Sequence, residues 1–276
     1  MRQYHRPVQS DENEPTATEP PVKVRNAATV ALVRDGDCGI EVFMLRRSLQ
    51  SAFVGGAYVF PGGAVDDADH PEDIEHLCVG LSDVDASERL GVERGGLSYW
   101  VAAVRESFEE AGVLLAVDGS DRLISFADPD VERRFLGWRS AVDAGTRSIR
   151  NVCEAESLRL ATDRMHYFSH WITPLGAPRR FDTRFFVCAA PTDQVPLHDD
   201  RETIANTWIR PAEALQRHHD GEFFMILPTI KTLEAIGRFP SADQFLTAAS
   251  QIGEVPTIMP RLDDNGEPQL TVVSRR

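Results

Sequence analysis

Nine consecutive residues, Arg105 to Val113, read R-E-S-F-E-E-A-G-V and constrain the fold of this chain more than any other segment. At about 3.6 residues per helical turn, four apolar side chains share one face: Val101, Val104, Phe108 and Ala111. Three carboxylates gather on the opposite face: Glu106, Glu109 and Glu110. The pattern predicts an amphipathic helix with Ser98 as its N-cap and Gly112 just beyond its end.

The three carboxylates would repel one another, and Arg105, one turn before Glu109, offsets this by only a few tenths of a kcal/mol. A solvated helix surface is one explanation, because acidic runs usually face water. A hard divalent metal ion with oxygen ligands is the other. The upstream turn Phe60–Gly63 favours the metal, since Gly62 and Gly63 let the backbone approach a metal or a phosphate closely.

Together, Phe60–Gly63 and Arg105–Val113 resemble the signature of the Nudix hydrolases, in which a Gly and a Glu precede R-E-U-x-E-E-x-G-U. The chain departs from it in three ways. Ser107 stands where the family has a bulky apolar residue, and the upstream Glu of the family is either replaced by Asp69 or displaced by the insert. An insert at about 66–97 lengthens the segment between the two halves.

The resemblance implies an α/β fold, a Nudix-type α/β/α sandwich with a mixed sheet, plus a loop or helical insert and C-terminal helices. It also implies a Mg²⁺ (or Mn²⁺) site made by Glu106, Glu109, Glu110 and the Gly62 or Gly63 carbonyl. Glu109 would share metal binding with water activation, and Arg105 would hold it in place. Naming one base among clustered carboxylates is a model choice. Glu202 is the candidate downstream base or ligand, with Asp199 and Asp200 behind it.

A second stretch is similar to the coenzyme A diphosphatase branch of the same family. Arg47, Ser48 and Gly56 match its spacing, while Leu45 and Ala52 replace its Thr and its second Arg. In that branch an Arg-Phe-Asp-Thr stretch precedes a strand beside the substrate, and here it begins at Arg180. The substrate-binding candidates are therefore Arg47, Gly62, Gly63 and Arg180, although surface or structural roles for the two arginines carry similar weight.

The resemblance thus implies a metal-dependent pyrophosphohydrolase that cleaves the diphosphate of a nucleoside diphosphate linked to another group, with coenzyme A or acyl-CoA favoured. The incomplete second signature leaves ADP-ribose, NADH and dinucleoside polyphosphates open. Two other classes remain: a non-catalytic Nudix-like ligand-binding protein, which the retained acids argue against, and an interaction scaffold built around the acidic insert.

A net charge of −14 argues against general nucleic-acid binding, because phosphate neutralisation needs clustered Lys and Arg. No run reaches the length of a membrane span. The four cysteines are dispersed, which predicts reduced, buried thiols and a cytoplasmic protein: Cys38, Cys78, Cys153 and Cys188. The expected partner is a small nucleotide-diphosphate substrate, and a homodimer is left open.

Three parts are expected along the chain: a disordered N-terminal tail at 1–24, a Nudix domain at 25–240 and a C-terminal extension at 241–276 packed on it. Predicted strands cover 27–33, 40–45 and 57–60, and helical regions cover 129–160, 211–215 and 226–236. A terminal hairpin is predicted from 255–260 and 269–273, with its turn at 263–266.

Overall fold

The computed structural model describes residues 22–51, 54–199, 201–262, 268–269 and 271–273. Most of the predicted tail, 1–21, lies outside the described residues. The first described strand, β1 (Val24–Gly36), begins three residues earlier than the predicted strand. The boundaries of the three predicted parts of the chain stay predictions.

A mixed sheet forms the centre of the fold, and in the described residues it has nine strands in the order β13-β10-β7-β8-β1-β2-β3, with β4 joined to β1 and β9 to β2. Strand β1 runs parallel to β8 and antiparallel to β2. The other strands of the sheet are β2 (Gly39–Arg47), β3 (Tyr58–Val59), β4 (Gly62–Ala64), β7 (His166–Ile172), β8 (Arg180–Ala189), β9 (Thr203–Ile209), β10 (Thr257–Ile258) and β13 (Val272–Val273). Two small ladders pair β5 (Ala116–Val117) with β6 (Arg159–Leu160) and β11 (Arg261–Leu262) with β12 (Pro268–Gln269).

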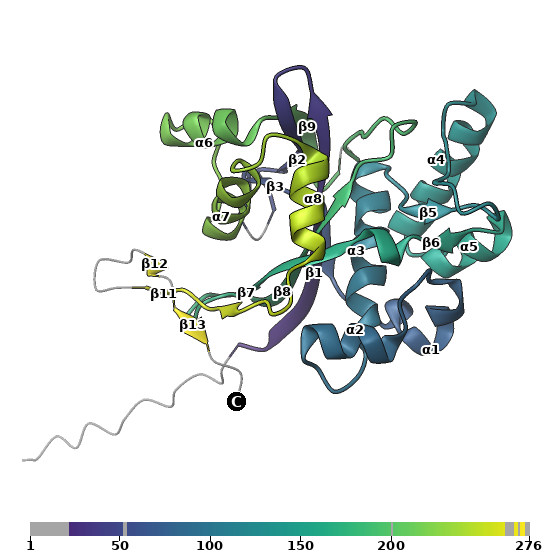
Figure 1. The fold of residues 1–276 in the computed structure, drawn as a ribbon, viewed down its shortest axis with the longest axis horizontal. Helices are drawn as coiled ribbons and strands as arrows, with labels where there is room; N and C mark the ends of the chain where they lie inside the picture. The colour runs from purple at the N-terminus through teal and green to yellow at the C-terminus, as the bar shows by residue number, and fades with distance from the viewer. Residues whose placement is uncertain (1–21, 52–53, 200, 263–267, 270, 274–276) are drawn as a thin grey trace, which may run out of the picture.

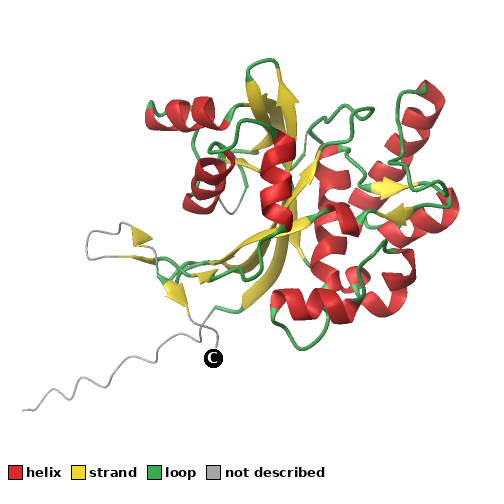
Figure 2. Ribbon diagram, viewed as in Figure 1, coloured by secondary structure: helices red, strands yellow, loops and turns green. Residues whose placement is uncertain are grey.

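Helices cover both faces of this sheet (Figure 1). One layer contains α2 (Asp83–Leu90), α3 (Leu97–Ala111), α4 (Pro129–Asp143) and α5 (Ile149–Glu156). The other contains α6 (Pro211–His219), α7 (Leu227–Ile236) and α8 (Ala242–Ser250). Figure 2 shows the strands running between these two groups of red helices. This arrangement confirms the predicted α/β/α sandwich with a mixed sheet.

Two hydrophobic cores follow from the alternation of side chains along β1. Val30 and Leu32 point to the first core, where they meet Trp100 and Phe108 of α3. Ala31 and Val33 point to the second, which also contains Phe245 of α8. The buried face of α3 is the predicted one, since each of its four residues is at most 1% exposed: Val101, Val104, Phe108 and Ala111.

The end of α3 is as predicted and its beginning is not. Gly112 adopts the left-handed conformation, with φ of 68°, just after the last helical residue. Ser98 is not the N-cap, because the helix already begins at Leu97 and Ser98 is buried within its first turn. The Asp83 carboxylate, which comes from α2, accepts hydrogen bonds from the Leu97 and Gly95 amides at 2.9 Å each. A cap supplied from a distant part of the chain leaves no local sequence signature.

The insert between β4 and α3 is mostly helical, as expected. It contains a 3₁₀ turn at Asp67–Asp69, the one-turn helix α1 (Pro71–Ile74), a second 3₁₀ turn at Glu75–Leu77, and α2. The predicted helical region 129–160 breaks into α4 and α5, because Ser148 starts a new helix by accepting a hydrogen bond from the Asn151 amide.

Near the C-terminus, β10 and β13 pair antiparallel, so the predicted hairpin is confirmed for these strands. Its turn, 263–266, lies outside the described residues. The cysteine prediction is wrong in one respect, because Cys38 is exposed, whereas Cys153 and Cys188 are buried. Burial raises the pKa of the Cys153 and Cys188 thiols to about 12, which makes both inert at neutral pH. Across the described residues, no helix combines the length and apolar character that crossing a bilayer requires.

Candidate active site

The glycine bend, Gly62 and Gly63, lies directly against both β1 and the acidic helix α3. It belongs to β4, which pairs with β1 so that Gly62 is opposite Thr29. The Thr29 hydroxyl donates to the Pro61 carbonyl at 2.6 Å and fixes the start of the bend. A Cβ added at Gly62 would lie 2.4 Å from Thr29 Oγ1, and one at Gly63 would lie 2.3 Å from Glu106 Oε1. Only glycine therefore permits this approach at either position.

Arg105 connects the acidic residues of α3 to the insert. Its Nε and Nη2 donate to the two carboxylate oxygens of Asp69 at 2.9 and 3.0 Å. Its Nη1 donates to Glu106 at 2.9 Å and to Glu109 at 3.2 Å, while Nη2 also reaches the Ala64 carbonyl at 2.8 Å. Arg105 is 8% exposed and Asp69 is fully buried. The guanidinium thus orients two glutamates and ties them to β4.

Replacing Asp69 with Ala is expected to lower the free energy of unfolding by about 3 kcal/mol, because it leaves Arg105 without its buried bidentate partner. The loss falls at the low end for a broken buried pair, since Arg105 keeps Glu106, Glu109 and a carbonyl. Urea denaturation measures it, with the exposed Asp130→Ala as the control. A loss below 1 kcal/mol would contradict a stabilising role for this pair.

Three glutamates of α3 differ in burial and therefore in ionisation. Glu110 is 3% exposed, and burial followed by the neighbouring Glu106 raises its pKa well above the ordinary value. Burial also raises the pKa of Glu106 to about 7, against the opposing effect of Arg105. The pKa of Glu109 is raised as well, again chiefly by burial. The raised pKa values mean that burial disfavours the ionised carboxylates more than the nearby arginines favour them. A bound cation would favour the ionised forms.

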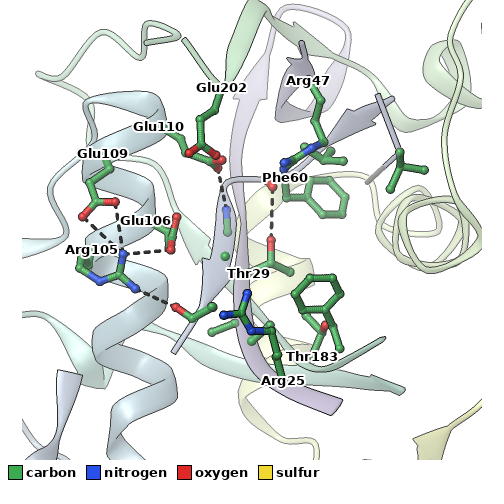
Figure 3. Close-up of a pocket in the computed structure, with 18 of the residues that line it drawn as sticks. Arg25, Thr29, Arg47, Phe60, Arg105, Glu106, Glu109, Glu110, Thr183 and Glu202 are labelled. Atoms are coloured by element: carbon green, nitrogen blue, oxygen red, sulfur yellow. Dashed lines mark hydrogen bonds and ion pairs between the residues drawn. The ribbon is translucent and has the colours of Figure 1, made fainter. Parts of the chain in front are cut away.

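Glu110 makes contact with the glycine bend, because its Oε2 accepts a hydrogen bond from the Gly62 amide at 2.9 Å (Figure 3). Within the described part of the chain, no three His, Cys, Asp or Glu side chains are arranged to hold a metal ion. The reason is visible in the contacts: Glu106 and Glu109 face Arg105, and Glu110 faces an amide. The donor set nevertheless fits a hard divalent cation, since it is all oxygen and abuts a bend with no Cβ.

A cavity of about 530 Å³ opens beside these glutamates. Seven acidic residues of the described chain line it: Asp66, Glu106, Glu109, Glu110, Asp143, Asp199 and Glu202. Three arginines of the lining come from other elements: Arg25, Arg47 and Arg179. Its aromatic lining is Phe60, Phe181 and Phe185. One pocket therefore combines the oxygen ligands a cation needs with guanidinium groups and apolar surface suited to a large anionic molecule.

The structure brings together nearly all of the residues proposed from the sequence: Arg47, Gly62, Gly63, Arg105, Glu106, Glu109, Glu110 and Glu202 line the same cavity. Arg180 is the exception, because in the described lining its place is taken by Arg179. Side chains alternate along β8, so Phe181 and Thr183 face the cavity and Arg180 faces the other way. Its Nε donates to the Thr173 carbonyl at 3.1 Å.

Between the downstream acids, the contacts favour Glu202 over Asp199. The Asp199 carboxylate accepts hydrogen bonds from the Thr203 amide and hydroxyl at 2.8 Å each and so stabilises a turn. Although burial opposes it, this bonding keeps the pKa of Asp199 below its ordinary value. Glu202 lies near enough to Glu110 to raise the pKa of that carboxyl. Asp200 and Ala52 lie outside the described residues.

Two further arginines interact with the acidic helix, Arg47 and Arg139. The Nε of Arg47 is buried without a hydrogen-bond partner in the described structure, and the charge of Arg47 lowers the pKa of Glu110. Arg139 of α4 donates to the Glu109 and Glu110 carbonyls at 2.9 and 2.8 Å and caps the C-terminus of α3. Its partner carbonyls lie in a different helix, so no local sequence pattern indicates this role.

Comparison with known proteins agrees with this geometry. A family model described as the NUDT19 Nudix domain matches residues 82–236, more than half of the chain. "Acyl-coenzyme A diphosphatase NUDT19" from Gallus gallus is 30% identical over 241 residues, which cover 75% of this chain and 63% of that protein. The Homo sapiens protein of the same name is 27% identical, with 74% and 62% coverage. The chain thus spans about three fifths of the length of these relatives.

A solved structure shares the fold. The crystal structure of a NUDIX hydrolase from Alicyclobacillus acidocaldarius superposes with a TM-score of 0.65 at 28% identity and covers 82% of this chain and 96% of that one. The solved structure shares the sandwich fold, and the family match over 82–236 includes the acidic helix α3. The chain belongs to the Nudix hydrolase family, in the branch represented by the NUDT19 Nudix domain.

Proposed function

We propose that this chain is a metal-dependent pyrophosphohydrolase that cleaves the diphosphate bond of coenzyme A or acyl-CoA. One observation carries the proposal: Glu106 and Glu110 of α3 lie against the Gly62–Gly63 bend, and Glu109 lines the same cavity, which also contains the partly unpartnered Arg47. Relatives named acyl-coenzyme A diphosphatase support the choice of substrate.

A diphosphate repels an incoming nucleophile with its own negative charge, so hydrolysis needs neutralisation of that charge and a positioned water. Mg²⁺ or Mn²⁺ held by Glu106, Glu109 and Glu110 would polarise the phosphoryl oxygens and lower the pKa of a bound water. Arg105 keeps Glu106 and Glu109 in orientation through its fork of hydrogen bonds. Glu109 is the least buried of the three and is suited to accept a proton from the attacking water.

Two other parts of the site would act on the substrate. Arg47 supplies a guanidinium at the glutamate side of the cavity, where it can bind a phosphate through two parallel hydrogen bonds. Glu202 lies on the same side and is a second candidate to move a proton. The free cysteine thiols of the described chain support a reducing compartment such as the cytoplasm.

The substrate is tested by assaying the full chain with Mg²⁺ over coenzyme A, an acyl-CoA, NADH, ADP-ribose and diadenosine polyphosphates. The expected result is cleavage of coenzyme A and acyl-CoA to adenosine 3′,5′-bisphosphate and the corresponding phosphopantetheine. Faster cleavage of another member of the panel would reassign the substrate. No cleavage of any member would favour a ligand-binding protein.

Removal of divalent metal with a chelator is expected to reduce hydrolysis at least 10²-fold, and Mg²⁺ or Mn²⁺ is expected to restore it. The same ions should raise the thermal midpoint of the wild-type chain, since a ligand that binds only the folded state stabilises it. Ca²⁺ and Zn²⁺ serve as comparison ions in both measurements. Full activity in the presence of chelator would overturn the metal-dependent mechanism.

A further inference from the structure

The cavity has a second cluster of positive charge, made by Arg25 and Arg179, away from the glutamates. Arg25 lies on β1, and Arg179 directly precedes β8. The parallel pairing of these strands sets Arg25 beside Phe181. Figure 3 shows Arg25 next to Thr29 and Thr183, whereas Arg47 enters the cavity on the other side of Phe60.

Neither Arg25 nor Arg179 has a hydrogen bond or an ion pair with any part of the chain that the structure describes. Some exposed arginines are paired with acids, such as Arg133 with Asp130 and Arg150 with Glu154, while others, such as Arg147, have no such partner among the described residues. An exposed arginine often does no more than face water. These two differ because they share one cavity wall, in a chain whose net charge of −14 offers many acids as partners.

The distance between the Arg25–Arg179 cluster and the glycine bend indicates the size of a ligand that could reach both. Strands rise about 3.3 Å per residue, so the Cα atom of Arg25 lies about 13 Å along β1 from that of Thr29, which anchors the glycine bend. A ligand that reaches both ends of this distance must have the size of a nucleoside, because a single phosphate is too small. Phe181, which is the register partner of Arg25 on β8 and lines the same cavity, adds apolar surface at this end of the cavity.

We propose that Arg25 and Arg179 form a binding subsite for a phosphate monoester carried on the nucleoside half of the substrate. The planar guanidinium groups match the geometry of a phosphate, which they bind through paired hydrogen bonds. The subsite rests on the proposed function, which places the diphosphate beside Glu110. It makes the enzyme prefer a nucleotide with an additional phosphate on its ribose over one without.

Binding without turnover tests the subsite first, with adenosine 3′,5′-bisphosphate and 5′-AMP as probes measured by calorimetry. The wild-type chain is expected to bind the bisphosphate at least about tenfold more tightly than AMP. The double variant Arg25→Ala, Arg179→Ala should lose this difference and keep its affinity for AMP, and Arg133→Ala should behave as wild type. Equal wild-type affinities, or equal weakening of both probes in the double variant, would overturn the subsite.

Kinetics with coenzyme A and 3′-dephospho-coenzyme A then separate the subsite from the proposed function. The double variant should show a roughly tenfold higher KM for coenzyme A, with kcat unchanged and dephospho-coenzyme A cleaved as by wild type. If wild type cleaves neither compound but still prefers the bisphosphate, the subsite stands and the proposed function fails. If wild type cleaves both with equal kcat/KM, the function stands and the subsite is wrong.

Discussion

Replacing Glu110 with Gln is expected to lower kcat/KM for the diphosphate substrate on the order of 10³-fold. Glu110 is the most buried carboxylate of the acidic helix and lies against the glycine bend, so its charge contributes to cation binding at low effective dielectric. The Gln side chain has nearly the same shape, and its amide oxygen can still accept the Gly62 hydrogen bond. The loss should therefore come from the missing charge and not from altered packing.

Stability provides the control for this variant. Because burial raises the pKa of Glu110 above its value in the unfolded chain, this residue destabilises the folded metal-free protein at neutral pH. The cost shrinks as the pH falls below the folded-state pKa and is gone only below the pKa of the unfolded chain. Glu110→Gln is neutral at every pH and should be at least as stable as wild type without metal at pH 7. Glu132→Gln, an exposed change on α4, should leave both activity and stability unchanged. Activity within tenfold of wild type for Glu110→Gln would remove this residue from the catalytic site.

The acidic helix could be predicted from the sequence because its information is local. The 3.6-residue period fixed the buried face of α3, and Gly112 marked its end. The strand–glycine bend–helix order then placed Gly62, Gly63 and the three glutamates together. The sandwich fold was predicted from the resemblance to a family, because the periodicity of one segment does not show how strands and helices pack together.

Contacts between distant segments could not be predicted in this way. The Asp83 cap of α3, the Arg139 contacts with its last carbonyls and the Asp69–Arg105 pair join residues 14 to 36 positions apart. The position of Arg180 outside the described cavity lining, where Arg179 lies instead, has a different cause. A sequence motif gives the residue type but not the face of the strand on which it lies. A shift of one residue moves a side chain to the opposite face, so the strand register must be known to choose between neighbours.

Gly63→Ala is expected to lower kcat/KM at least 10²-fold with little loss of stability. A methyl group at this position would lie 2.3 Å from Glu106 Oε1 and 2.5 Å from its Cδ. The carboxylate is the flexible end of a side chain, so it can move away at small energetic cost. Moving it, however, breaks its hydrogen bond with Arg105 and withdraws an oxygen ligand from the bend.

Gly62→Ala is the matched comparison, because the same methyl group one residue earlier meets the main chain. It would lie 2.5 Å from Thr29 Cβ and 2.6 Å from the Ala28 carbonyl oxygen, neither of which can move without shifting β1. This variant should lose about 1–3 kcal/mol of unfolding free energy, as expected for overpacking. Urea denaturation and kcat/KM measured on both variants would separate the two effects. If Gly63→Ala kept full activity, Glu106 would not need to lie against the bend, and the arrangement of the acidic helix would not account for catalysis.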